Sequence, residues 1–323
     1  MIIDLAIHCF SMWHHFRHAP GFDCIAYVDM MEKLGFTGVN LSLNDTNYRH
    51  LGGREDWRIA AFGERVARSG MSLEIDTSGT TPDHLRRMLG VARRMGAASL
   101  RTYTRHGGTP AEMMAATIAD LKAAMPAATD AGVTIVLENH EDFTGPELTA
   151  IVQAVDHPRL KILYDYGNSQ MVLEDPEEAL DAVLPHVHSV HVKDHVMVRP
   201  EHAGELSVAG VPMGEGFLPI RALTSRILTH GLRRITFENV WAYRAPIRAG
   251  RNPIGRARLG EGSFRFLEPP FDPRRIVLDP ARHGGAELVS LERQALDRGL
   301  PWFKGVLAEL GVTGYRSSRS PGP

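Results

Sequence analysis

The chain is poor in cysteine and has no excess of positive charge. Cys9 and Cys24 are too few for a disulfide framework in 323 residues, so we expect reduced thiols and a cytoplasmic location. Lysine and arginine total 36 and aspartate and glutamate total 38, which gives a net charge of −2. Because binding to a phosphate backbone needs clustered basic residues, we expect no nucleic-acid partner.

Long apolar runs are also missing. No segment approaches the roughly 18 consecutive apolar residues that a membrane helix requires, so we expect no membrane span. The opening residues, MIIDLAIHCF, carry Asp4 and His8 inside an apolar run and have no basic leader, which is untypical of a signal peptide. With 43% hydrophobic residues, the chain can still bury a large core.

Strand-like and helix-like segments alternate along most of the chain. Apolar runs rich in β-branched residues predict strands at 2–8, 38–43, 71–76, 98–103, 133–139, 161–166, 187–193 and 234–240. Amphipathic segments, several of which begin with Pro or are followed by Gly, predict helices at Ile25–Leu34, Trp57–Arg68, Pro82–Met95, Pro110–Ala131, Pro146–Val155, Pro176–Leu184 and Leu218–Thr229. This repeated strand and helix pattern is typical of an α/β protein with a (β/α)8 barrel.

The alternation breaks at residues 245–285, after the eighth predicted strand. This segment is rich in Arg, Pro and Gly, has no clear period, and is too long for an ordinary connection. We expect an irregular insertion over the active-site mouth or at a subunit interface. A last helix, at about Ala286–Leu310, should pack on the barrel wall, and 317–323 should form a flexible tail. We expect residues 1–323 to form a single barrel domain.

Four predicted strands end on a side chain that can bind a metal ion. These side chains are Glu138 in TIVLENH, Asp165 in KILYDYGN, His191 in HSVHVKD and Glu238 in RITFENVW. In a barrel of parallel strands, these ends meet at the face where such enzymes have their active sites. A mostly oxygen donor set suits one divalent cation, and we expect Mn2+ first, with Mg2+, Co2+ or Zn2+ as alternatives.

Each of these residue types also has an ordinary structural explanation. A glutamate at a strand end can pair with a cation, a histidine can lie in the core, and an aspartate can begin a turn. Their occurrence on four consecutive strands favours a shared metal site. Because residues i and i+2 of a strand share a face, His140 should lie beside Glu138, and Lys193 beside His191.

These motifs resemble the xylose isomerase-like TIM barrel family, which includes sugar phosphate isomerases, ketose 3-epimerases, inosose dehydratases and hydroxypyruvate isomerases. The resemblance covers about residues 1–242 and rests on LENH, YDYGN, HVKD, FENVW and the glycine-rich MGEGFLPI. It implies that Glu138, Asp165, His191 and Glu238 bind the metal. The chain has Asn168 where ketose 3-epimerases usually carry a substrate-binding His, and this departure weighs against a simple epimerase.

A metal ion beside a sugar carbonyl would stabilise the enediolate that forms when the adjacent C–H loses its proton. Return of the proton gives an epimerase or isomerase, and expulsion of a substituent gives a lyase. We expect isomerase or epimerase chemistry, with Glu138, Glu238 and His140 as candidate acid/base groups. Lys193 is a candidate for holding the developing oxyanion.

Loop residues at the predicted barrel mouth suit a small carbohydrate substrate, because they combine aromatic faces with hydrogen-bonding groups. The residues expected to bind it are His8, Trp13, Arg101, His106, Asn168, Asp194 and Trp241. His14, His15 and His18 could form a second metal site, although adjacent histidines on a loop are more often surface residues.

Several alternatives stay open. C-glycoside deglycosidases of the same family cleave 3-oxo-glycosides by elimination and work with a small β subunit, and His140, Asn168 and the long insertion favour this branch. An oxo-sugar dehydratase or decarboxylase would share the same site. An endonuclease IV-like phosphodiesterase would need a trinuclear metal site and a basic groove, and a non-catalytic barrel would not need an intact ligand set. We expect a homo-oligomer, or a hetero-oligomer if the protein is a deglycosidase.

Overall fold

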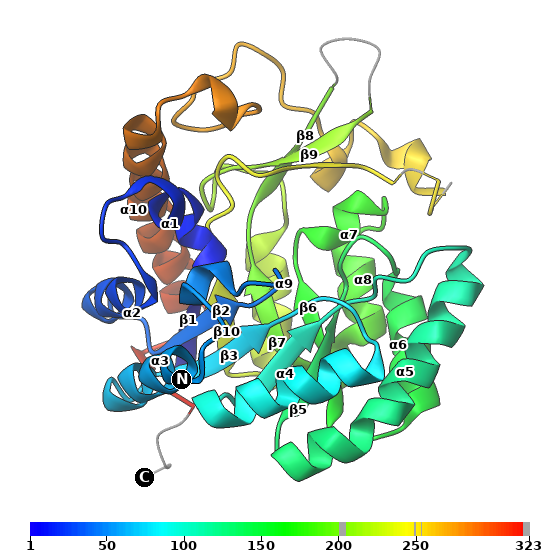
Figure 1. The fold of residues 1–323 in the computed structure, drawn as a ribbon. Coiled ribbons are helices and arrows are strands. Elements are labelled where there is room, and N and C mark those ends of the chain that lie inside the picture. The colour runs from blue at the N-terminus through cyan, green and yellow to red at the C-terminus, as the bar shows by residue number, and fades with distance from the viewer. Residues whose placement is uncertain (200–204, 249, 253, 319–323) are drawn as a thin grey trace.

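The apolar runs form a closed ring of parallel strands (Figure 1). The computed structural model describes residues 1–199, 205–248, 250–252 and 254–318, and within them eight strands make the barrel. They are β1 (Ile2–His8), β2 (Gly38–Ser42), β3 (Ser72–Asp76), β4 (Ser99–Thr102), β5 (Thr134–Glu138), β6 (Leu160–Asp165), β7 (Val187–Val192) and β10 (Arg234–Phe237). Neighbouring strands pair in chain order, and β10 closes the ring on β1. The predicted barrel is confirmed.

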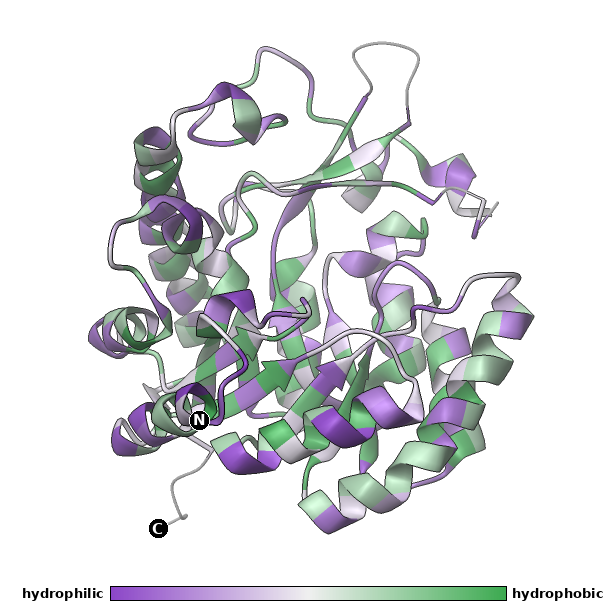
Figure 2. Ribbon diagram, in the orientation of Figure 1, coloured by the Kyte–Doolittle hydropathy of each residue, from purple (hydrophilic) through white to green (hydrophobic). Residues whose placement is uncertain are grey.

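Helices surround the barrel, and their sequences mix hydrophilic and hydrophobic residues as Figure 2 shows. The surrounding helices are α2 (Cys24–Lys33), α3 (Asp56–Arg68), α4 (Pro82–Met95), α5 (Pro110–Ala131), α6 (Gly145–Val155), α8 (Pro176–Val183) and α9 (Ile220–Thr229). In α4, for example, Leu85, Met88 and Leu89 are buried while Arg86 and Arg87 are exposed. None of the helices in the described parts of the chain combines the length and apolarity that a bilayer crossing demands.

The two ends of α5 show why helix boundaries could be predicted from the sequence. A capping box closes its first turn, in which the Thr109 hydroxyl accepts from the Glu112 N–H and the Glu112 carboxylate accepts from the Thr109 N–H. At the other end, Gly132 adopts φ +70°, the left-handed conformation that favours glycine. Strand β5 begins two residues later, so the helix end also fixes the start of a ligand-bearing strand.

A second, smaller sheet lies over the barrel, and the sequence analysis missed it. Strands β8 (His195–Val198), β9 (Ser207–Gly210) and β11 (Arg244–Pro246) pair in antiparallel fashion. Figure 1 shows β8 and β9 above the barrel strands. Strand β8 follows β7 after only two residues, so the sequence does not show where one strand ends and the next begins.

The insertion after β10 contains β11 and three short 3-10 helices in its described residues. They are η4 (Ile254–Arg258), η5 (Gly262–Phe264) and η6 (Pro280–Arg282). The insertion packs on the small sheet, because Phe264 is buried in a cluster with Met197 and Val208. The placement of this segment over the active-site mouth or at a subunit interface stays a prediction.

The chain ends on the barrel wall. The predicted last helix is confirmed as α10 (Gly285–Glu309), and the short strand β12 (Gly314–Tyr315) pairs with the start of β1. Of the expected tail, Ser317 is buried and the Ser318 N–H donates to Asp4 Oδ2 over 3.0 Å. Residues 319–323 lie outside the described residues.

Glu292 ties α10 to the first loop of the barrel. That loop contains η1 (Cys9–Met12) and α1 (Trp13–His18), and α1 has no side-chain cap from its own sequence. The buried Glu292 carboxylate accepts the backbone N–H groups of His14 (2.8 Å) and His15 (3.0 Å), which would otherwise lack partners in the first helical turn. His15 Nδ1 lies 2.6 Å from the same carboxylate. Helix α10 thus supplies the cap of α1.

Replacing Glu292 tests this link. We expect Glu292→Ala to lower the free energy of unfolding by about 2 kcal/mol, because a helix cap and buried hydrogen bonds are lost together. Urea denaturation followed by circular dichroism measures the change. Glu309→Ala, on the same helix with a side chain that is 56% exposed, is the control and should change it by less than about 0.5 kcal/mol. Equal losses in the two variants would contradict the capping role.

Candidate metal centre

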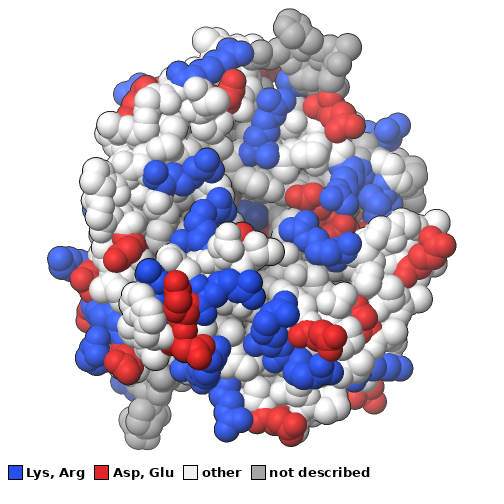
Figure 3. All heavy atoms as spheres, in the orientation of Figure 1, with Lys and Arg blue, Asp and Glu red and all other residues white. Residues whose placement is uncertain are grey.

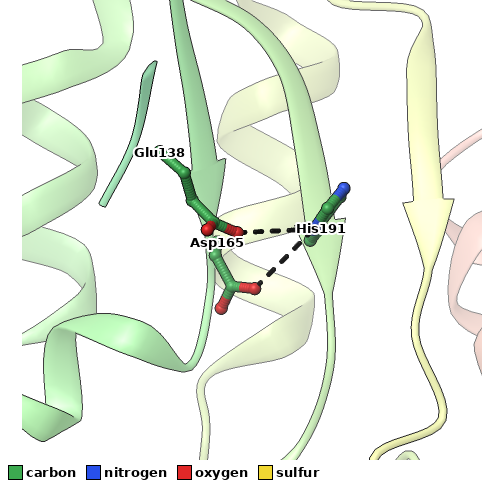
Figure 4. A group of neighbouring side chains, drawn as sticks. All are labelled: Glu138, Asp165 and His191. Atoms are coloured by element: carbon green, nitrogen blue, oxygen red, sulfur yellow. Dashed lines mark ion pairs between the residues drawn. The ribbon is translucent and has the colours of Figure 1, made fainter. Parts of the chain in front are cut away.

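Three potential ligands converge at the carboxyl end of the barrel strands (Figure 4). Glu138 ends β5, Asp165 ends β6, and His191 is the penultimate residue of β7. Their ligand atoms lie within 4.8 Å of one another, and all three side chains are buried. His191 Nδ1 lies 3.5 Å from Glu138 Oε1 and 4.0 Å from Asp165 Oδ2. The structure therefore places three of the four predicted ligands in one candidate site for a divalent metal.

The carboxylates of this group are not satisfied by hydrogen bonds. Both oxygens of Glu138 and Oδ2 of Asp165 are buried without a hydrogen-bond partner in the described residues. Burial raises the pKa of Asp165 to about 6, with further increases from Glu238 and Glu138 that Lys193 opposes. Arg101 Nη2 lies 2.6 Å from Glu138 Oε2 and Lys193 Nζ lies 2.9 Å from Asp165 Oδ2, so ion pairs offset part of this negative charge. Buried carboxylates beyond those that cations offset are costly, and a divalent cation would stabilise them. The carboxylate oxygens, together with one imidazole, therefore fit a hard or borderline cation.

Glu238, the fourth predicted ligand, follows β10 directly and lies beside this group. Its Oε2 is 3.7 Å from Nζ of Lys193, and that Nζ is 2.9 Å from Oδ2 of Asp165. Its Oε1 is 3.4 Å from Nδ1 of His8. The ammonium of Lys193 thus offsets part of the negative charge of two carboxylates that come from different strands.

Two carboxylates of β3 support the site, and the sequence analysis missed them. Glu74 Oε1 lies 3.6 Å from His191 Nε2 and accepts from Asn40 Nδ2 over 3.0 Å. Asp76 contacts Nε2 of His8. Such outer contacts fix the orientation of a ligand ring. The signal was present in SLEID, where the two acids alternate onto one face of an otherwise apolar strand.

A pocket of about 450 Å³ adjoins the candidate metal centre. Figure 3 shows a hollow in this view of the molecule, with Lys and Arg side chains around it. Many of the residues predicted to act on or bind a substrate line the pocket. They are Trp13, Arg101, His140, Asn168, Lys193, Glu238 and Trp241.

His140 and Arg101 are held in the pocket wall by Tyr103. The rings of His140 and Tyr103 stack with centroids 3.8 Å apart and an angle of 4° between them. The Arg101 guanidinium lies 4.7 Å from the Tyr103 centroid, and its Nη2 is 2.6 Å from Oε2 of Glu138. Burial is the main influence on His140 and lowers its pKa to about 3, against the effect of Glu138. The imidazole is therefore neutral at neutral pH and fixed in orientation.

The other predicted substrate residues have structural partners. His8 is buried between Asp76 and Glu238. His106 Nε2 lies 2.7 Å from Asp120, and Asp194 accepts the Gly216 N–H over 2.9 Å. None of the three belongs to the described lining of the pocket, so their contact with a substrate stays a prediction.

The second metal site considered at His14, His15 and His18 is not formed. Within the described ranges, only Glu138, Asp165 and His191 bring three potential ligand atoms within 4.8 Å of one another. His15 pairs with Glu292, and the His14 ring stacks on His18 with centroids 6.0 Å apart.

The pocket also contains residues that sequence reasoning did not assign to it. Phe10, Tyr103, Tyr243 and Arg244 line it beside the predicted residues. Phe10 lies in η1, Tyr103 and Tyr243 lie in the loops after β4 and β10, and Arg244 begins β11. The alternation that locates strand residues does not extend into loops, so their positions were not predictable.

The fold and ligand pattern match a known family. A family model described as xylose isomerase-like TIM barrel matches residues 28–258. The chain belongs to this family. The match runs from α2 to η4 and so includes all the candidate ligands.

Two curated relatives are similar in sequence. The chain is 28% identical over 204 residues to the uncharacterized protein YihM of Escherichia coli, covering 63% of this chain and 62% of that protein. The chain thus spans less than two thirds of that relative. It is 26% identical over 230 residues to the 3-oxo-isoapionate decarboxylase of Pectobacterium atrosepticum, covering 70% of this chain and 81% of the relative.

Solved structures share the fold at low sequence identity. A xylose isomerase domain protein from Planctomyces limnophilus has a TM-score of 0.65 at 14% identity, covering 96% of this chain and 99% of that one. A D-psicose 3-epimerase solved with D-fructose has a TM-score of 0.65 at 13% identity, covering 94% and 99%. A family protein from Mycobacterium smegmatis in complex with magnesium has a TM-score of 0.56 at 18% identity, covering 73% and 89%. These likenesses support the fold.

Metal binding is expected to depend on Glu138. We expect Glu138→Gln to weaken Mn2+ binding about a hundredfold, because a neutral amide replaces an anionic ligand. Isothermal titration calorimetry on the metal-free protein measures the affinity. Glu64→Gln, whose side chain is 70% exposed on α3, should leave it unchanged. Unaltered Mn2+ binding by the Glu138 variant would remove Glu138 from the site.

Metal ions should also stabilise the fold. At a free Mn2+ concentration a hundred times the Kd, the free energy of unfolding should rise by about 2.7 kcal/mol, because only the folded chain assembles the site. A chelator should reverse the gain. Thermal unfolding with and without Mn2+ checks this, and the Glu138→Gln variant should gain little. A wild-type midpoint that does not respond to Mn2+ would argue against a metal centre.

Proposed function

We propose that the protein is a divalent-metal-dependent enzyme that removes a proton next to the carbonyl of a sugar or oxo-sugar, with isomerase or epimerase chemistry. The observation that carries the proposal is the group of buried carboxylates beside an imidazole and next to a pocket, in which the carboxylates of Glu138, Asp165 and Glu238 are paired with only two cationic side chains, Arg101 and Lys193. Glu138, Asp165, His191 and Glu238 would hold the ion, with Mn2+ the first candidate. A cation bound there acts as a Lewis acid that polarises the carbonyl and stabilises the enediolate.

Side chains at the pocket carry the proton transfer in this proposal. Glu238 lines the pocket, and one of its oxygens has no hydrogen-bond partner in the described residues, so it is placed to accept a proton. His140 lines the same pocket with its ring held by Tyr103 and is the second acid/base candidate. Glu138 lies deeper, next to Arg101, and we assign it mainly to the ligand set.

Lys193 stabilises negative charge that develops on the substrate oxygen. Its side chain is 8% exposed and lines the pocket, and its Nζ already lies within 4 Å of the carboxylates of Asp165 and Glu238. A preorganised ammonium of this kind needs little rearrangement as charge develops. Trp13, Asn168 and Trp241 would hold the rest of the sugar.

A lyase reaction is the second candidate, and the charge of the pocket favours it. Arg101 and Lys193 are paired with Glu138 and Asp165, but Arg244 on the wall donates to the Ser207 hydroxyl and has no carboxylate partner among the described residues, so its guanidinium suits a substrate carboxylate. Loss of CO2 from a 3-oxo sugar acid would break a C–C bond and leave its electron pair in an enolate conjugated with the 3-oxo group. A proton from solvent, relayed by His140 or Glu238, would then bond to that carbon. The sequence similarity to a 3-oxo-isoapionate decarboxylase supports this candidate.

Exchange in D2O separates the two candidates. The Mn2+-loaded protein is incubated with ketoses, inososes, 3-oxo-glycosides and 3-oxo sugar acids, and proton NMR follows each compound. Deuterium entering next to the carbonyl of an otherwise intact or isomerised sugar supports the isomerase proposal. Release of CO2 or of a substituent supports the lyase. If the metal-loaded protein changes none of these compounds, the proposed chemistry is wrong.

His140 is tested by a variant that keeps its stacking. We expect His140→Phe to bind Mn2+ normally and to lose at least about a hundredfold in kcat, because phenylalanine stacks on Tyr103 but transfers no proton. Turnover and metal content are measured on the same preparation. His230→Phe, at an exposed position after α9, is the matched control. An unchanged rate in the His140 variant would exclude it from the mechanism.

A further inference from the structure

The pocket has two parts of different chemistry. Around the metal centre its wall is polar, with Lys193, Glu238 and Asn168. Its remaining wall includes a largely apolar group that we call the outer pocket, formed by Phe10, Trp13, His14, Val240, Trp241 and Pro280. These residues come from the first loop, from the segment after β10, and from η6 in the insertion. Proton transfer next to a carbonyl does not require this second part.

Trp241 offers the pocket the apolar surface of its ring and no free hydrogen-bond donor. Its indole N–H already donates to the backbone oxygen of Pro273 over 2.9 Å. Its ring meets the His14 ring edge to face, with centroids 5.8 Å apart. Trp13 is likewise held, because the guanidinium groups of Arg17 and Arg49 lie 5.2 Å and 4.6 Å from its ring centroid. The two indoles are therefore fixed apolar surfaces.

His14 is a fixed part of the wall of the outer pocket. It is 4% exposed, and its Nδ1 is buried without a hydrogen-bond partner in the described residues. The backbone of His14 is anchored by Glu292 from α10, so the imidazole is positioned from outside the barrel. Because Nδ1 is inaccessible, His14 contributes to the pocket through the rest of its ring, which meets the Trp241 ring edge to face.

The size and polarity of the space indicate what occupies it. Pockets of roughly 300 to 1,000 Å³ accept drug-sized ligands, so about 450 Å³ holds more than one sugar ring. A second sugar would bring several hydroxyl groups that need hydrogen-bond partners. Phe10, Val240, Trp241 and Pro280 offer none from their side chains towards the pocket, whereas a flat apolar group would pack against them.

We propose that the outer pocket binds a flat apolar substituent, an aryl group, carried by the sugar whose carbonyl lies at the metal centre. This inference rests on the proposed function, because it places the sugar beside Glu238 and Lys193. It makes the substrate an aryl glycoside or a similar conjugate rather than a free sugar. His14 and Trp241 are then the residues that determine specificity for the substituent.

Binding of paired glycosides tests the proposal. Methyl and 4-nitrophenyl 3-oxo-β-glycosides derived from glucose, galactose, mannose and xylose are titrated into the Mn2+-loaded full chain by calorimetry. We expect the 4-nitrophenyl compound of at least one pair to bind at least about tenfold more tightly, because the ring buries apolar surface in the outer pocket. If no 4-nitrophenyl glycoside binds more tightly than its methyl partner, the subsite assignment is wrong.

Variants locate the aryl group. His14→Ala and Trp241→Ala should each reduce the preference for the aryl compound at least about threefold, while Mn2+ content stays at the wild-type level. The matched controls His230→Ala and Trp57→Ala change exposed residues and should leave the preference for the aryl compound unchanged. A preference that survives in both pocket variants would place the ring elsewhere and overturn the proposal. Failure of the wild type to bind Mn2+ would instead contradict the metal-dependent function, so the two failures are distinguishable.

Discussion

Buried negative charge is the constraint on which this molecule depends. Glu138, Asp165 and Glu238 bring three carboxylates to the end of the barrel, and Glu74 and Asp76 add two more beside them. Acidic groups in a low-dielectric interior repel one another unless cations or donors stabilise them. Arg101 and Lys193 supply part of that stabilisation, and oxygens without hydrogen bonds mark where the rest has to come from. The arrangement is therefore incomplete as protein alone and chemically ready for a cation.

The barrel and three clustered ligands could be predicted from the sequence because they follow local rules. Each ligand stands at the polar end of a short apolar run, and parallel strands bring such ends together. Glu138, Asp165 and His191 needed only that rule. Glu74 could have been found by the same alternation, since it shares a strand face with Asp76 in an otherwise apolar run.

Contacts between segments that are distant in the chain could not be predicted from the sequence. The small sheet of β8, β9 and β11 joins residues on both sides of α9. Its first strand, β8, follows β7 so closely that the sequence shows the two strands as one apolar run. Glu292 meets His14 across 278 positions, and nothing local to either residue indicates the partner. The stacking of His140 on Tyr103 likewise joins two loops. These contacts, rather than the strands, shape the pocket. The potential metal ligands were therefore more predictable from the sequence than the substrate.

The cap that Glu292 places on α1 has a consequence for how the protein is made. Synthesis proceeds from the first residue, so the loop that carries Trp13 and His14 leaves the ribosome long before α10 exists. Until residue 292 has emerged, the first turn of α1 lacks the acceptor for its free N–H groups. The strands that carry the candidate metal ligands precede residue 292 in the chain, so they leave the ribosome before this wall of the pocket can reach its final form. The order of synthesis thus separates the candidate metal centre from the first loop that lines the pocket.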